Sequence, residues 1–228
     1  MFILPQIYIP NNKIIMKKHL LALFVMMFLL PMCKEKASQS NYIDTYYIPT
    51  SLMASVRQSS DSIKHIRVSV EHDVAKDYHR LSSEVANRDM FNTYSEYYND
   101  TNYQRYDDDG EYGSASCNPL SSISVTCDND WNASHPVGTS LNDIVYVEVR
   151  SYHAFLQSNY SKHELVCAML PKLDYAAIPP FADWFDISFT SKPAVAGKYK
   201  LTINVKFGAD PITGKIVEVP PVTVEVDF

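Results

Sequence analysis

The sequence has little glycine, no long apolar run and no recognisable catalytic motif. Only 6 of its 228 residues are glycine, and no phosphate-binding glycine loop is present. The longest uniformly apolar run, Leu20–Met32, has 13 residues, whereas a membrane-spanning helix needs about 20. Gly-x-Ser-x-Gly, Cys-x-x-Cys and His-Glu-x-x-His patterns are also missing. We therefore predict no catalytic residue, no metal and no cofactor, although dispersed catalytic residues would leave no motif.

The chain also lacks an excess of basic residues. It has 20 Lys and Arg against 26 Asp and Glu, a formal charge of −6. Without residues 1–32 the balance becomes 17 against 26, a charge of −9. Such an acidic chain is not expected to bind nucleic acid, since affinity for the phosphate backbone depends on Lys and Arg.

An export signal precedes the bulk of the chain. Lys17 and Lys18 are followed by the apolar run Leu20–Met32 and then by Cys33, a length and charge pattern typical of a signal peptide. A buried core helix is the alternative. Leu30-Pro31-Met32-Cys33 resembles a bacterial lipobox, although Met32 stands where that family has a small residue. The resemblance implies a lipid on Cys33 and attachment to a membrane.

These features divide the chain into four expected parts. Residues 1–15 are expected to be an upstream extension, with Met16 or Met1 as the true start, and residues 16–32 are expected to be the signal peptide. The polar residues 33–42 form a tether, and residues 43–228 form one domain. Lys34-Glu35 resembles the surface-export signal of Bacteroidetes lipoproteins, which implies the bacterial outer membrane and the cell surface.

The domain is expected to be mainly β. Lys198–Phe207 alternates strictly, with Tyr199, Leu201 and Ile203 on one face, the pattern of a half-buried strand. Gly208–Lys215 has turn chemistry. Ser82–Tyr98 has a partial helical stripe and predicts a short helix, whereas Val166–Leu170 is ambiguous. Further expected strands are Ile66–Val70, Ser121–Cys127, Ile144–Arg150, Trp184–Thr190, Ile216–Val219 and Val222–Phe228.

Short alternating strands separated by turns predict an antiparallel β-sandwich with a short helix and long loops. Ala196–Val205 resembles a late strand of bacterial immunoglobulin-like surface domains, which implies an immunoglobulin-like sandwich. Ser124–Asp128, Trp131–Ala133 and Ser140–Ile144 give the chain a resemblance to uncharacterised lipoproteins of gut Bacteroidetes, which implies location and fold class but no activity.

Two charged clusters are candidate ion sites. Glu71-His72-Asp73, with Asp77 and His79, lacks the regular ligand spacing of a zinc site. The acidic run 107–111 lacks the alternating ligands and distal Glu of a calcium-binding EF-hand loop. Both are interpreted as solvated charged stretches.

Tyrosine is abundant, with 16 residues. Several tyrosines fall in a stretch rich in Asn, Asp, Ser and Gly, and residues 99–116 contain no large aliphatic side chain. Tyrosine on a polar loop is typical of binding surfaces, because the ring offers rigid contact area and a hydroxyl. The alternative is that the rings cover a sandwich edge. The candidate binding residues are Tyr94, Tyr97, Tyr98, Tyr103, Tyr106 and Tyr112.

Export would place three further thiols where disulfides persist. We predict a disulfide between Cys117 and Cys127, with Cys167 a buried free thiol in an apolar stretch. A disulfide between Cys127 and Cys167 is the alternative, which stays open because the sequence does not determine which cysteines pair. Asp61-Ser62-Ile63 resembles the O-glycosylation sequon of Bacteroidetes envelope proteins, which implies a glycan on Ser62.

The sequence is therefore expected to encode a lipid-anchored surface protein that binds through Tyr-rich loops and is not an enzyme. Its partners are expected to be the membrane, through the lipid, and a glycan or another envelope protein. A hydrolase with dispersed catalytic residues and a purely structural envelope subunit are the alternatives.

Overall fold

The computed structural model describes residues 42–58, 64–103, 113–162 and 165–228. The chain divides into residues 1–38, which lie outside the described residues, and a second unit, residues 39–228, to which the following refers. This unit is mainly β, with three mostly antiparallel sheets and two α-helices. The helices are α2 (Val85–Tyr97) and α3 (His153–Gln157). The strands are β1 (Ile43–Tyr47), β2 (Pro49–Gln58), β3 (Lys64–His72), β4 (Tyr78–His79), β5 (Gly113–Ser116), β6 (Leu120–Cys127), β7 (Val145–Ser151), β8 (Leu165–Met169), β9 (Phe181–Phe189), β10 (Lys198–Phe207) and β11 (Val222–Asp227).

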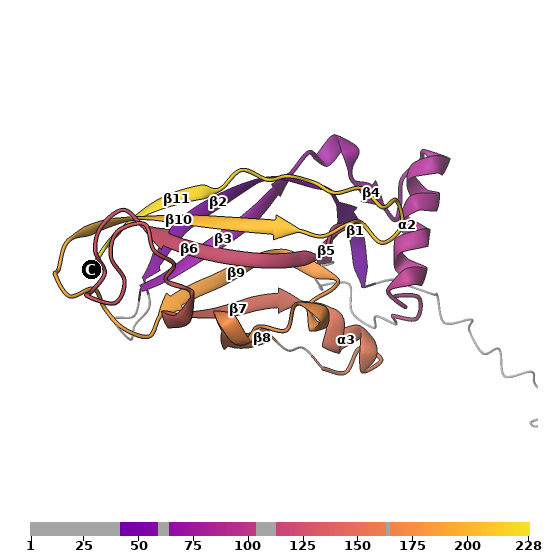
Figure 1. The fold of residues 1–228 in the computed structure, drawn as a ribbon. Coiled ribbons are helices and arrows are strands. Elements are labelled where there is room, and N and C mark those ends of the chain that lie inside the picture. The colour runs from indigo at the N-terminus through magenta and orange to yellow at the C-terminus, as the bar shows by residue number, and fades with distance from the viewer. Residues whose placement is uncertain (1–41, 59–63, 104–112, 163–164) are drawn as a thin grey trace, which may run out of the picture. The chain divides into compact units, whose positions relative to one another are not determined.

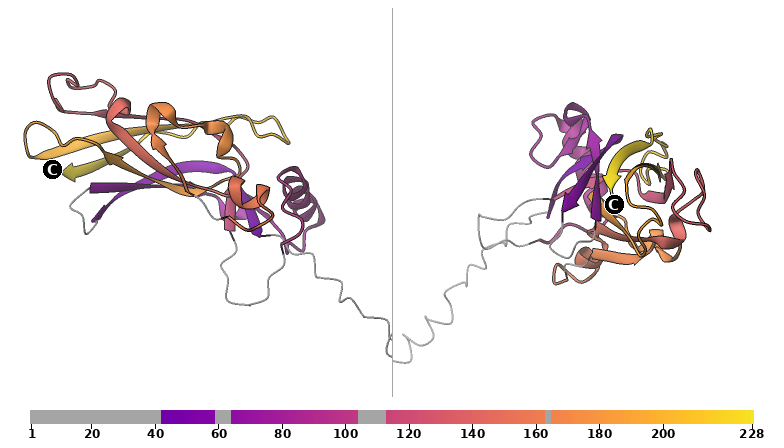
Figure 2. Two further views of the ribbon diagram at one scale, coloured as in Figure 1. Left: turned by 90° about the horizontal axis from the view of Figure 1, so that it is seen from below. Right: turned by 90° about the vertical axis from the view of Figure 1, so that its left-hand side faces the viewer.

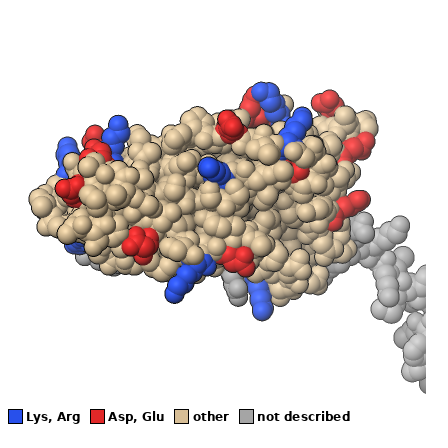
Figure 3. All heavy atoms as spheres, in the orientation of Figure 1, with Lys and Arg blue, Asp and Glu red and all other residues tan. Residues whose placement is uncertain are grey.

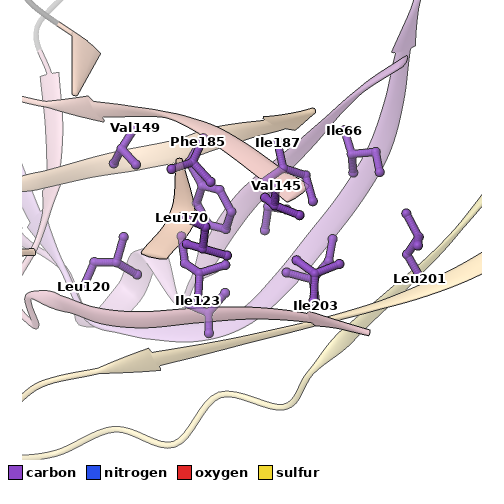
Figure 4. Close-up of a cluster of buried hydrophobic side chains, with 14 of the residues drawn as sticks. Ile66, Leu120, Ile123, Val145, Val149, Leu170, Phe185, Ile187, Leu201 and Ile203 are labelled. Carbon is purple, nitrogen blue, oxygen red and sulfur yellow. The ribbon is translucent and has the colours of Figure 1, made fainter. Parts of the chain in front are cut away.

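Two sheets face each other across the main core (Figure 1). One has the order β11-β10-β6 and the other the order β2-β3-β9-β7-β8. Alternate residues of each strand point inward, as the period of two requires, and Figure 4 shows side chains from both sheets meeting between them. Burial of these apolar groups is the main stabilising contribution to the fold. They include Ile66, Ile123, Val145, Val149, Phe185, Ile187, Leu201 and Ile203.

A third sheet, of order β4-β1-β5, lies beside α2. Its β1 and β5 strands pair in parallel, although β2, β3 and α2 separate them in the sequence. Phe91 and Tyr94 of α2 are fully buried and join Tyr46 of β1 in a second apolar cluster. Because Phe91 and Tyr94 are three residues apart, they lie on one face of the helix.

The strongest sequence patterns correspond to observed elements. The expected strand Lys198–Phe207 is β10 without change, and its predicted apolar face is buried. The predicted helix is α2, although Val85, part of the expected stripe, is exposed. The ambiguous segment Val166–Leu170 forms most of β8. The strands β1, β2, β4 and β5 and the helix α3 were not predicted.

One predicted strand is wrong. The segment 216–219 lies outside the strands, between the turn after β10 and β11. Pro220 and Pro221 follow it and have no N–H to donate to a ladder. The chain is instead held where the side chain of Asn118 donates to the carbonyls of Gly208 and Lys215, at 2.9 Å each.

Candidate functional site

A cleft of about 310 Å³ lies between three segments of the chain. Figures 1 and 2 show α2 and α3 at the same end of this unit, away from Phe228. The cleft is lined by the end of α2, by α3 and by the segment that precedes β9. The lining residues are Tyr97, Tyr98, Asn99, His153, Leu156, Gln157, Ala176, Pro179 and Pro180.

The end of α2 is fixed by a Schellman motif. Asn99 has a φ of 60°, a left-handed conformation that Asn tolerates better than most residues. Its N–H donates to the carbonyl of Glu96 at 3.1 Å, and the N–H of Asp100 donates to that of Ser95 at 2.8 Å. These bonds satisfy carbonyls that a helix end would otherwise leave open. The positions of Tyr97 and Tyr98 beside the cleft are thereby fixed.

The opposite wall ends in the same way. Beyond α3, the N–H of Asn159 donates to the carbonyl of Leu156 at 3.2 Å, and the N–H of Tyr160 donates to that of Phe155 at 2.8 Å. Both Asn159 and Tyr160 have positive φ, 53° and 63°. A helix of five residues has little stability of its own, so these bonds and the packing of Phe155 hold it in place.

The start of α3 is tied to the segment 178–180. The Ser151 hydroxyl donates to the carbonyl of Ile178 at 2.6 Å, and the N–H of Tyr152 donates to the carbonyl of Pro180 at 3.1 Å. His153 Nδ1 lies 3.0 Å from the carbonyl oxygen of Pro179. Since a carbonyl only accepts, Nδ1 carries the proton, and Nε2 of the neutral ring is an acceptor. The Pro179–Pro180 peptide bond is cis.

The two helix ends are also tied to each other. The N–H of Asn102, just beyond α2, donates to the Tyr160 hydroxyl at 2.9 Å. Asp100 accepts from the N–H groups of Tyr42 and Ile43 at 3.0 and 2.8 Å. Burial raises the pKa of Asp100, and these hydrogen bonds offset part of the rise. Burial also raises the pKa of Tyr160 to about 12, so its hydroxyl stays protonated at neutral pH. Hydrogen bonds therefore hold the segments on both sides of the cleft in place.

The lining combines aromatic, apolar and neutral polar groups. Tyr97 is 57% exposed, and its ring meets that of Tyr98 edge to face, with 4.9 Å between centroids. Asn99 and Gln157 are exposed amides that both donate and accept hydrogen bonds. Asp, Glu, Lys and Arg are scattered over the face of the molecule drawn in Figure 3, but none is among the described residues that line the cleft. Such a cleft suits a small ligand that has an apolar face and hydroxyl or amide groups.

The six predicted tyrosines have different places. Tyr97 and Tyr98 line the cleft, at the end of a helix instead of on a loop. Tyr94 is fully buried and unavailable to a ligand. Tyr103 is partly buried and packs edge to face on Tyr160, with centroids 5.3 Å apart. Tyr106 and Tyr112 lie outside the described residues, as do Cys33 and Ser62.

The predicted disulfide is not formed. Cys117 and Cys127 are free, buried thiols that belong to different apolar clusters. β6, Leu120–Cys127, separates them, and seven extended steps span roughly 23 Å. A disulfide needs Cα atoms less than about 7 Å apart. Cys167 is also free, and the expectation that it is buried is wrong: it is exposed on β8, an edge strand.

Other histidines form acid pairs outside the cleft. His72 Nδ1 lies 2.7 Å from Asp77 Oδ2, and His135 Nε2 lies 2.9 Å from Asp143 Oδ1. Burial raises the pKa of Asp77, and the nearby His72 opposes the rise. Within the described part of the chain, no group of three or more His, Cys, Asp or Glu side chains could hold a metal ion. The acidic run 107–111 lies outside the described residues.

Sequence reasoning missed His153, Asn99 and Gln157. The only local signal was Asn99-Asp100 after a helical stripe, which is a helix-stop pattern. Nothing in the sequence indicated that Asn99 lies near His153 and Gln157, which are more than fifty positions away.

Neither α-helix of the described chain is long and apolar enough to cross a membrane. Comparison with known proteins found no matching family model, no matching curated protein and no matching solved structure.

Proposed function

We propose that this chain is a lipid-anchored protein of the bacterial outer-membrane surface that binds a small ligand and does not transform it. The cleft between α2, α3 and the segment 176–180 is the binding site. The observation that carries this proposal is Tyr97, a large aromatic side chain that is 57% exposed beside a cleft whose described lining residues include no Asp, Glu, Lys or Arg. Exposed rigid aromatic surface next to hydrogen-bonding groups is typical of recognition sites.

The polar groups at the cleft favour binding over hydrolysis. A serine nucleophile needs a histidine within hydrogen-bond reach to remove its proton. The Ser151 hydroxyl donates to the carbonyl of Ile178 and accepts from the backbone N–H of His153, and His153 Nδ1 faces the carbonyl of Pro179. These groups serve to join α3 to the next segment, and no observation favours the hydrolase or the purely structural subunit.

The lipid anchor rests on the sequence. The signal-peptide pattern ends at Cys33, and a polar tether follows it. Metabolic labelling with a fatty-acid analogue should mark the protein, and the variant Cys33→Ala should lose the mark. Equal labelling of that variant would contradict the anchor, and protease treatment of intact cells would test exposure on the outer surface.

We also propose that the fold is an immunoglobulin-like sandwich. Two facing sheets that share one apolar core support it. The third sheet, with its parallel β1–β5 pair, would be an addition to that plan.

The binding site is tested by substitution at the cleft. Full-length protein in detergent is immobilised, and a panel of soluble oligosaccharides, short peptides and choline is passed over it with surface plasmon resonance as readout. At least one class should bind, and Tyr97→Ala should weaken that binding, whereas Leu81→Ala, an 85% exposed position outside the cleft lining, should not. Binding that is the same in all three proteins would refute the site.

A further inference from the structure

We propose that the ligand of the cleft is a neutral carbohydrate, with one sugar ring stacked on Tyr97. This inference rests on the proposed function and names its ligand class. A sugar presents C–H groups on one face and hydroxyls around its edge, so it needs an aromatic surface and neutral polar partners together. Tyr97, Asn99, His153 and Gln157 provide that combination around one cleft.

The described lining residues favour a neutral ligand over a charged one. A carboxylate or phosphate is normally bound by Arg or Lys, and neither is among the described residues that line the cleft. A quaternary ammonium group is recognised by several aromatic faces, whereas two tyrosine rings, Tyr97 and Tyr98, are found among the described lining residues. Tyr98 is partly buried and also stacks on Tyr46, with centroids 6.1 Å apart.

The hydrogen-bonding groups match hydroxyls, which donate and accept at one atom. His153 Nε2 is an acceptor in the neutral ring, because Nδ1 donates to the carbonyl of Pro179. The amides of Asn99 and Gln157 each offer a carbonyl oxygen and an NH₂ group. A sugar hydroxyl can therefore donate a hydrogen bond to His153 Nε2. Other hydroxyls of the sugar can donate to the carbonyl oxygen of Asn99 or Gln157 and accept from its NH₂ group.

The walls are arranged before the ligand arrives. Schellman motifs end both α2 and α3, and the hydrogen bonds of Ser151 and His153 hold α3 to the segment 178–180. Preorganisation reduces the ordering cost of binding. A cleft of about 310 Å³ is at the lower end of ligand pockets, which suits roughly one or two sugar units.

The experiment compares matched neutral and charged probes on full-length protein in detergent. The probes are neutral hexose oligosaccharides, oligosaccharides of the same length that carry uronic acid, a tyrosine- and proline-containing peptide, and choline. The proteins are the wild type, Tyr97→Ala, Tyr97→Phe, Gln157→Ala and the control Leu81→Ala. Tyr97 and Gln157 are exposed, so these variants are expected to fold, which circular dichroism would verify.

Neutral oligosaccharides should bind the wild type and the control equally. Tyr97→Ala should weaken binding about tenfold or more, because the stacking face is lost. Tyr97→Phe keeps the ring and should stay within about threefold of the wild type, and Gln157→Ala should weaken binding about threefold to tenfold, the loss of one hydrogen bond.

The other outcomes separate this inference from the proposed function. If only the acidic oligosaccharide, the peptide or choline binds, and Tyr97→Ala abolishes that binding, the carbohydrate class is refuted and the binding site remains. If no probe binds in a manner that depends on Tyr97, both are refuted.

Discussion

The hydroxyl of Tyr94 donates a hydrogen bond to Asp210 Oδ2 at 2.6 Å, across 116 positions of the chain. Tyr94 is on α2, and Asp210 begins the turn that follows β10. Both side chains are buried. Asp210 also accepts from the hydroxyl of Thr213 and from the N–H of Ile212 at 2.9 Å. One carboxylate thereby orders the turn and attaches it to the helix whose end borders the cleft.

Tyr94→Phe should destabilise the domain. The substitution removes one donor to a buried carboxylate, and a hydrogen bond to a charged group contributes about 1.5–3 kcal/mol. Urea unfolding followed by circular dichroism should therefore show a loss of that size. Tyr97→Phe, on the same helix but exposed, is the control and should be neutral. Equal stability of the wild type and Tyr94→Phe would show that the bond contributes nothing.

Asp210 should also shape the dependence of stability on pH. Burial favours a higher pKa for Asp210, but hydrogen bonds from Thr213, Tyr94 and two backbone amides outweigh it and hold the pKa below its usual value. A carboxyl whose pKa is lower in the folded state stabilises the fold above its unfolded pKa. That stabilisation is lost as pH falls through the folded pKa.

The measurement is the free energy of unfolding between about pH 6 and pH 2, since the carboxyl reference pKa is about 3.9. Asp210→Asn should have a lower free energy of unfolding than the wild type at pH 6. As pH falls, the free energy of unfolding should decrease less in Asp210→Asn than in the wild type. Burial raises the pKa values of Asp77 and Asp100, which act in the opposite direction but are present in both proteins. Asn92→Ala, at an exposed position of α2 without a titratable group, is the control and should lose stability with falling pH as the wild type does. An equal loss of stability in Asp210→Asn and the wild type as pH falls would refute the role.

The three described thiols should differ in reactivity. Cys117 is fully buried, and burial, with the nearby Asp210 and Asp77 carboxylates, raises its pKa to about 12, so almost no thiolate exists at neutral pH. Cys167 is exposed. A maleimide should therefore label Cys167 in the native protein and Cys117 only after unfolding, as peptide mass spectrometry would show. A Cys117–Cys127 peptide in a non-reducing map would contradict the separation of these two residues.

Gly113→Ala should strain the contact between β5 and α3. A Cβ at Gly113 would lie 2.7 Å from Cζ of Tyr152 and closer still to its hydroxyl. Tyr152 is buried at the start of α3 and has little room to move. Overpacking of this kind costs about 1–3 kcal/mol, which thermal unfolding would detect. Ser114→Ala, the neighbouring position on β5, is the matched control, and a neutral Gly113→Ala would show that Tyr152 can shift freely.

Local patterns determined a large part of the main core, across which two sheets face each other. Strict alternation in Lys198–Phe207 predicts both β10 and its buried face, because side chains of a strand point to opposite sides in turn. The helical stripe predicts α2 for a similar reason, with a period near 3.6. Both patterns can be read from the segment alone, because a strand or helix with one buried face has its apolar residues at a regular spacing.

Only the tertiary structure determined where the cleft forms and whether the cysteines pair. β1 pairs in parallel with β5 across a long stretch of chain. His153, the first residue of α3, lines the same cleft as Asn99, which follows α2. Composition placed Tyr94 and Tyr97 in one binding loop, but the helix turns one into the core and the other to solvent. Short sequence separation likewise suggested a Cys117–Cys127 bridge, whereas the extended strand between them holds the sulfur atoms apart. Sequence specifies which segments bury a face, and only their packing decides which side chains meet.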